Sequence, residues 1–179
     1  ISRQSLNISI YNVNENFLSS FNNFIANLNN SDEVIIKICP KPNADIANLK
    51  KFIKQQGKLI LALDLTSLGD AINPELCQKL IDSCPNIKAF SITSGLKEVP
   101  LLPDSLISLY ISQCPELETI AKLPESLEIL KIVDCPKLKV LPQKWPPLLV
   151  SFELAKCRHL SQRNRLSTLS QIFNANFNQ

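Results

Sequence analysis

Three cysteines recur at nearly constant spacing in the second half of the chain. Cys114, Cys135 and Cys157 are separated by 21 and 22 residues, and such spacings match no zinc-binding motif. Cysteine otherwise behaves as a small hydrophobic residue, so we interpret the three as a buried ladder of thiols with weak hydrogen bonds to the backbone. Reduced thiols favour a cytosolic location, and we predict no metal site.

His159 is the only histidine and follows Cys157 by two residues. A Cys-His pair is a known nucleophilic arrangement, and an enzyme that uses this pair is one hypothesis. However, no orienting carboxylate or oxyanion donor is evident near it. The sequence also contains no G-x-G-x-x-G, P-loop or H-E-x-x-H motif. We therefore predict a protein that is not an enzyme and that has no catalytic residues, no cofactor and no small-molecule substrate.

The composition is that of an ordinary folded domain. The chain has 179 residues, 45% of them hydrophobic, and a formal net charge of +3, which is too small to indicate binding to nucleic acid or to an acidic membrane. No apolar run approaches the roughly 18–20 residues that span a bilayer. The first residues show neither a signal peptide nor an initiator methionine, so we expect the chain to be a fragment.

Two segments of the chain are copies of one another. "LPDSLISLYISQCPEL" (102–117) and "LPESLEILKIVDCPKL" (123–138) share nine identical residues at an offset of 21, which indicates a structural repeat. The unit reads L-x-x-L-x-I-x-x-C-P-x-L-x-x-L. Similar strand-like patterns extend in both directions and predict seven strands, whose second core residues lie at positions 10, 38, 65, 92, 111, 132 and 154.

The spacing of the predicted strands defines two classes of repeat. The first three spacings, of 27 or 28 residues, leave room for a helix after each strand, and apolar residues at helical spacing occur within 14–30, 43–57 and 73–86. Asn14 or Asn16 is the expected N-cap of the first helix, Gly57 the expected C-cap of the second, and Asn73 the N-cap of the third. The later, shorter repeats have Leu-Pro pairs that favour an extended return. A final amphipathic helix is expected to cap the last coil.

These residues resemble a leucine-rich repeat protein. The short repeats with "LPDSL" and "LPESL" resemble those of bacterial, Legionella-type effectors, and the longer repeats resemble the ribonuclease-inhibitor class. The resemblance implies an α/β fold: a leucine-rich repeat solenoid with a parallel concave sheet and a single domain over 1–179. Within it we expect long helix-backed repeats at 1–86, short extended-backed repeats at 87–160 and a C-terminal capping helix at 161–179.

The residues between the core positions of each strand should face the concave surface. The expected middle column, one residue from each strand in order, reads Ser9, Lys37, Asp64, Ser91, Tyr110, Lys131 and Glu153. Tyr110, Lys131 and Glu153 should thus lie side by side, and Ile129 and Val133 should be exposed beside Lys131. An aromatic residue, an ion pair and two exposed aliphatic residues on one face favour a protein-binding patch over a merely solubilising Lys-Glu pair. The predicted partner-binding residues are Lys37, Asp64, Ser91, Tyr110, Gln113, Ile129, Lys131, Val133, Asp134 and Glu153.

We therefore predict a non-catalytic protein-protein interaction module that binds a folded protein partner and neither nucleic acid nor membrane. The family resemblance implies a secreted bacterial effector that works in the host cell cytoplasm and blocks or recruits a host protein or another effector. The alternative is a substrate-recognition arm of a larger enzyme, such as a ubiquitin ligase, with its catalytic part outside this chain.

Overall fold

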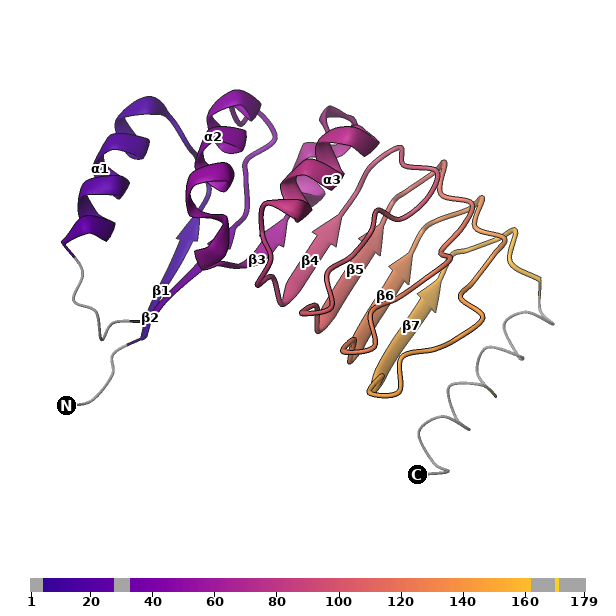
Figure 1. Cartoon of the computed structure of the whole chain (residues 1–179). Coiled ribbons are helices and arrows are strands. Elements are labelled where there is room, and N and C mark those ends of the chain that lie inside the picture. Colours follow the sequence, from indigo (N-terminus) through magenta and orange to yellow (C-terminus); the bar gives the residue numbers. More distant parts are fainter. Residues whose placement is uncertain (1–4, 28–32, 162–169, 171–179) are drawn as a thin grey trace.

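Seven parallel strands form one sheet in the order in which they occur along the chain. The computed structural model describes residues 5–27, 33–161 and 170. The strands are β1 (Ser5–Ile10), β2 (Glu33–Ile38), β3 (Ile60–Asp64), β4 (Ala89–Ile92), β5 (Ser108–Ser112), β6 (Ile129–Val133) and β7 (Ser151–Ala155). Each strand pairs only with its neighbours in sequence, an α/β arrangement that is compatible with a solenoid (Figure 1). The seven predicted strands are thus confirmed.

Three helices lie on one side of the sheet, and extended segments connect the later strands (Figure 1). The helices are α1 (Glu15–Ala26), α2 (Ile46–Gln56) and α3 (Pro74–Asp82), with short 3₁₀ helices at Gly57–Leu59 and Thr66–Ala71. No helix in the described part of the chain is long and apolar enough to cross a membrane. The predicted capping helix at 161–179 lies almost wholly outside the described residues.

Asparagine side chains begin two of the helices. Asn14 Oδ1 accepts a hydrogen bond from the Phe17 amide at 2.8 Å, and Asn73 Oδ1 accepts one from the Leu76 amide at 2.8 Å. These bonds satisfy amide groups that the first turn of a helix leaves unpaired. Asn73 is therefore confirmed as the N-cap of α3. Of the two candidates for the N-cap of α1, Asn14 is the one that caps the helix.

The end of α2 corrects one expectation about glycine. Gly57 does occupy the C-cap, but its φ of −55° and ψ of −31° are right-handed, so no left-handed turn requires a glycine there. The reason is steric instead. A Cβ at Gly57 would lie 1.7 Å from the carbonyl oxygen of Ser83, at the end of α3. Glycine therefore allows the ends of these two helices to approach closely.

Equivalent apolar residues of successive coils stack to form the core. Leu109 and Leu130 are in register, as are Ile111 and Ile132, and each of the four is no more than 1% exposed. Burying such a side chain contributes about 1.5–3 kcal/mol relative to leaving it exposed. Because each coil covers the apolar side of the next, the identical residues of the repeat supply the stability of the stack.

The pairing of β2 with β3 differs from the predicted register. We expected Lys37 opposite Asp64, but Lys37 pairs with Ala62 and Ile38 pairs with Leu63, after an irregularity at Ile36. The observed partner of Lys37 lies two residues before the expected one, so Lys37 stands apart from the column that begins at Asp64.

Candidate functional site

One column of outward-facing side chains runs across four strands. Ser91, Tyr110, Lys131 and Glu153 are in register from β4 to β7. Nζ of Lys131 lies 3.3 Å from Oε2 of Glu153, with the two side chains 48% and 50% exposed. We call the face that bears this column the open face, since the described helices lie on the other side of the sheet (Figure 1). The predicted side-by-side placement of Tyr110, Lys131 and Glu153 is confirmed.

Two aliphatic residues flank Lys131 on β6. Ile129 lies between Ser108 and Ser151, and Val133 lies between Ser112 and Ala155. Both are half-buried, so the expectation that they are exposed was too strong. In-register neighbours on both sides cover part of each side chain. The remaining exposed part still places apolar surface beside a charged pair.

Lys37 and Asp64 do not join the charged pair of the open face. Lys37 is exposed on β2 and pairs with Ser9 and Ala62. Asp64 is in register with Ser91, but its Oδ1 accepts hydrogen bonds from the amide and the hydroxyl of Thr66, at 3.1 and 2.7 Å. The carboxylate of Asp64 thus stabilises the turn after β3.

The residue directly after each of the last three strands has a left-handed backbone. Gln113, Asp134 and Lys156 have φ values of 50°, 57° and 55°, and we call them the rim residues. The amide of Gln113 donates to the carbonyl of Val133, and the amide of Asp134 donates to that of Ala155, both at 2.9 Å. Sequence reasoning placed Gln113 and Asp134 among the partner-binding residues but missed the conformation of all three.

A shallow hollow of about 410 Å³ lies where the open face meets this rim. We call it the rim hollow. Ser112 Oγ and Thr93 Oγ1 lie 2.9 Å apart in its wall. The lining combines Tyr110 and Val133 with hydroxyl groups and the three rim residues: Thr66, Ser67, Thr93, Tyr110, Ser112, Gln113, Val133, Asp134 and Lys156.

The recurring cysteines lie beneath this rim. Cys114, Cys135 and Cys157 are 1%, 0% and 0% exposed, and their Sγ atoms donate to carbonyls two residues earlier at 3.4, 3.6 and 3.3 Å. Hydrogen bonding to Cys114 raises the pKa of Cys135 to about 12. The predicted buried thiol ladder is confirmed, and all six cysteines are thiols rather than disulfides.

The Cys157–His159 hypothesis requires an accessible thiol. Cys157 is fully buried, whereas His159 is exposed and its amide donates to the carbonyl of Pro136 at 3.1 Å. A reactive cysteine normally lies in a partly exposed site, and this burial disfavours Cys157 as a nucleophile. Within the described ranges, no group of three or more His, Cys, Asp or Glu side chains is placed to hold a metal ion.

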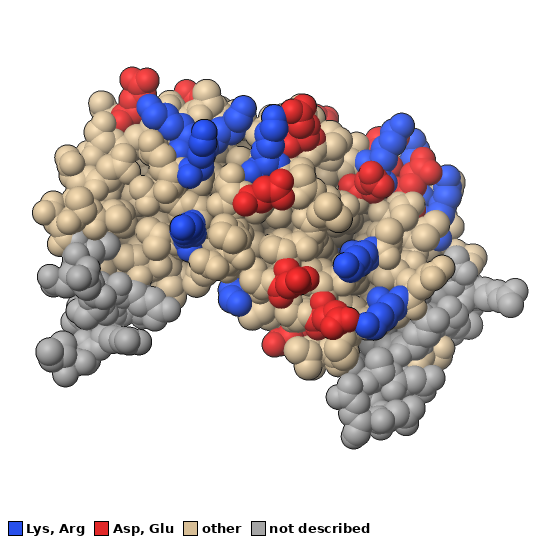
Figure 2. Space-filling view, viewed as in Figure 1, with Lys and Arg blue, Asp and Glu red and all other residues tan. Residues whose placement is uncertain are grey.

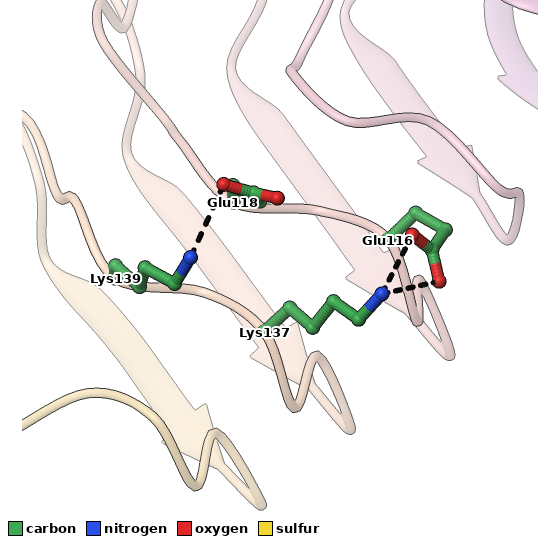
Figure 3. A network of polar contacts seen from close by, with 4 residues as sticks. All are labelled: Glu116, Glu118, Lys137 and Lys139. Atoms are coloured by element: carbon green, nitrogen blue, oxygen red, sulfur yellow. Dashed lines mark hydrogen bonds and ion pairs between the residues drawn. The ribbon is translucent and has the colours of Figure 1, made fainter.

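Charged side chains of successive coils also pair beyond the strands. Lys137 Nζ lies 2.8 Å from Glu116, and Lys139 Nζ lies 3.3 Å from Glu118 (Figure 3). The ammonium group of Lys137 hydrogen-bonds to Glu116 and lowers the pKa of that carboxyl group. Figure 2 shows acidic and basic side chains interspersed on the face in view. These exposed pairs contribute little to stability.

A second hollow, of about 340 Å³, lies beside α3 where the extended connections begin. The Gln78 amide group spans part of its wall, since it accepts from the Leu101 amide at 2.8 Å and donates to the Leu101 carbonyl at 3.1 Å. Leu101 itself is 77% exposed. Sequence reasoning missed this hollow, although the change from long to short repeats near residue 87 marks where the helical layer ends.

Comparison with protein-family models, with curated proteins and with solved structures found no match.

Proposed function

We propose that this chain is a leucine-rich repeat module that binds a folded protein through its open face, without catalysis. The observation that carries the proposal is the in-register column of Ser91, Tyr110, Lys131 and Glu153. Its side chains combine a hydroxyl group, an aromatic ring and both signs of charge on one face of the sheet. Tyrosine is enriched among the residues that dominate binding energy at protein interfaces.

The apolar neighbours of the column support binding over a purely solubilising role. An exposed Lys-Glu pair contributes only about 0–1 kcal/mol and needs no aliphatic residues beside it. Ile129 and Val133 nevertheless present half-buried aliphatic surface on both sides of Lys131. A partner that covers Lys131 and Glu153 would bury this surface as well.

The leucine-rich repeat assignment is supported by the stacked 21-residue unit, with its core leucines in register and a buried thiol in each turn. On the resemblance to Legionella-type effectors, we propose a partner among host proteins or other effectors, and a working place in the host cell cytoplasm. The six reduced thiols agree with a reducing compartment.

The test is a comparison of two double variants of the purified chain. Tyr110→Ala with Lys131→Ala removes the centre of the open face. Tyr11→Ala with Lys139→Ala removes the same residue types elsewhere, where Tyr11 is 56% exposed. Partners are captured from a host-cell lysate, identified by mass spectrometry and then titrated in purified form.

We expect the first variant to lose about 2 kcal/mol of binding free energy or more, which is roughly a 30-fold rise in Kd. The control variant should bind within about two-fold of the unmodified chain, since neither residue belongs to the column and an exposed ion pair such as Lys139–Glu118 contributes little. Thermal unfolding of both variants checks that the fold is intact. Unchanged affinity after loss of Tyr110 and Lys131 would contradict the proposal.

A further inference from the structure

The rim hollow combines features that exceed what the turn beneath it needs. Its backbone requires a left-handed residue after each strand, and glycine or asparagine meets that requirement most easily. The chain instead has Gln113, Asp134 and Lys156, with φ of 50°, 57° and 55°. Three different side chains, of which Gln113 and Lys156 are not favoured in this conformation, therefore line the hollow.

Asp134 is the only carboxylate that the described residues contribute to the wall of this hollow. It is half-buried, and none of the ion pairs found among the described residues includes it. Lys156 is exposed on the next coil and is in no such pair either. The hollow thus presents one negative and one positive charge on adjacent coils, and the two side chains do not form an ion pair with each other.

Tyr110 and the hydroxyl groups complete the chemistry of the hollow. The half-buried ring of Tyr110 lines the same space as Asp134. Thr93 and Ser112 hydrogen-bond to each other at 2.9 Å, and their hydroxyl groups retain lone pairs that accept further hydrogen bonds. An aromatic face, a carboxylate and several acceptors together suit a planar cation that donates many hydrogen bonds.

We propose that the rim hollow binds an arginine side chain of the protein partner. The guanidinium group donates to the Asp134 carboxylate and lies over the ring of Tyr110, two contacts that arginine makes better than lysine. Lys156 then favours an acidic group next to that arginine and disfavours a second cation. This inference rests on the proposed function, since it names the chemistry that the open face recognises.

The experiment titrates the full chain with N-acetyl-arginine amide and, separately, with N-acetyl-lysine amide, observed by two-dimensional amide NMR. We expect saturable shifts for the amides of Tyr110, Gln113 and Asp134 with the arginine probe and weaker shifts with the lysine probe. Asp134→Asn is the matched variant, because asparagine tolerates the left-handed backbone and removes only the charge.

Asp134→Asn should weaken binding of the arginine probe about ten-fold, the loss expected for a hydrogen bond to a charged group. Glu116→Gln, which removes a carboxylate outside the hollow, should leave the titration unchanged. Equal binding to the unmodified chain and to Asp134→Asn, or shifts spread over all exposed carboxylates, would overturn the proposal.

The same variant separates this inference from the proposed function. If a partner no longer binds Tyr110→Ala/Lys131→Ala but still binds Asp134→Asn, the arginine site is refuted and the proposed binding face is supported. A partner retained by both variants would refute both.

Discussion

Replacing Gln113 by glycine should stabilise the protein. Gln113 has a φ of 50°, and the left-handed conformation costs an L-residue about 1–2 kcal/mol. Glycine avoids this cost, but its freedom in the unfolded chain costs about 0.4–1 kcal/mol. The Gln113 side chain is exposed and none of the described side-chain hydrogen bonds involves it, so little else is lost. The free energy of unfolding should therefore rise by about 0.5–1 kcal/mol.

The assay is urea and thermal unfolding followed by the fluorescence of Trp145, the only tryptophan. Its side chain is 5% exposed and packs edge-on against Phe152, with the two ring centroids 5.1 Å apart. Unfolding therefore exposes the indole to water. For a chain of this size, 1 kcal/mol shifts Tm by about 2–4 °C. We therefore expect Gln113→Gly to raise Tm by about 1–4 °C.

Ala121→Gly is the matched control for this measurement. Ala121 is exposed and is absent from the positive-φ residues of the described chain, so glycine relieves no strain there. This variant should lose about 0.4–1 kcal/mol through the unfolded state. The reasoning is refuted if Gln113→Gly destabilises the protein as much as Ala121→Gly does.

Three further measurements test the packing and the thiols. Gly57→Ala should destabilise by at least about 2 kcal/mol, because the new Cβ overlaps the carbonyl of Ser83; a neutral result in urea unfolding would contradict the close approach of α2 and α3. Ser94→Ala should cost about 1–2 kcal/mol, because it leaves the buried carbonyl of Ile72 without its 2.8 Å donor, and Tm reports the loss. Iodoacetamide should modify only Cys39 in the native protein, since the other five thiols are buried, and intact-mass spectrometry would reveal any second adduct. Burial raises the pKa of Cys39 above that of an ordinary thiol, so its alkylation rate should rise with pH later than the rate of an exposed cysteine does.

The stacking of the short repeats was predictable because their core is almost literally repeated. Leu109 and Leu130, 21 residues apart, can only be equivalent if two coils are stacked in register, and they are. The junction of β2 and β3 offered no such copy. There the run "LILALDL" (59–65) places both Leu63 and Leu65 on the core side. Registers two residues apart keep the same side chains on the same face, so the alternation could not distinguish Leu63 from Leu65 as the partner of Ile38.

The open face was predictable for a related reason, and the rim was not. Side chains alternate along a strand, so fixing Leu130 and Ile132 in the core places Lys131 outward. The left-handed backbone at Asp134 depends on how the chain turns after β6. Glutamine, aspartate and lysine at such positions do not indicate this conformation as clearly as glycine does. The available signal was positional, because each of the three rim residues directly precedes the recurring cysteine of its coil.

If the open face binds a partner as we propose, stability and partner binding make opposite demands on the rim residues. If the turns after β5, β6 and β7 had only a structural role, glycine or asparagine would satisfy all three at lower cost, and natural sequences often sacrifice stability where function needs a particular side chain. A Gln113→Gly/Asp134→Gly variant should therefore unfold at a higher temperature and yet lose affinity for the partner. Leu130→Ala, a core change that costs about 2–5 kcal/mol, should lower both. A higher unfolding temperature with a lower affinity in the rim variant indicates a recognition role. A decrease in both quantities, as expected for the core variant, indicates a folding defect.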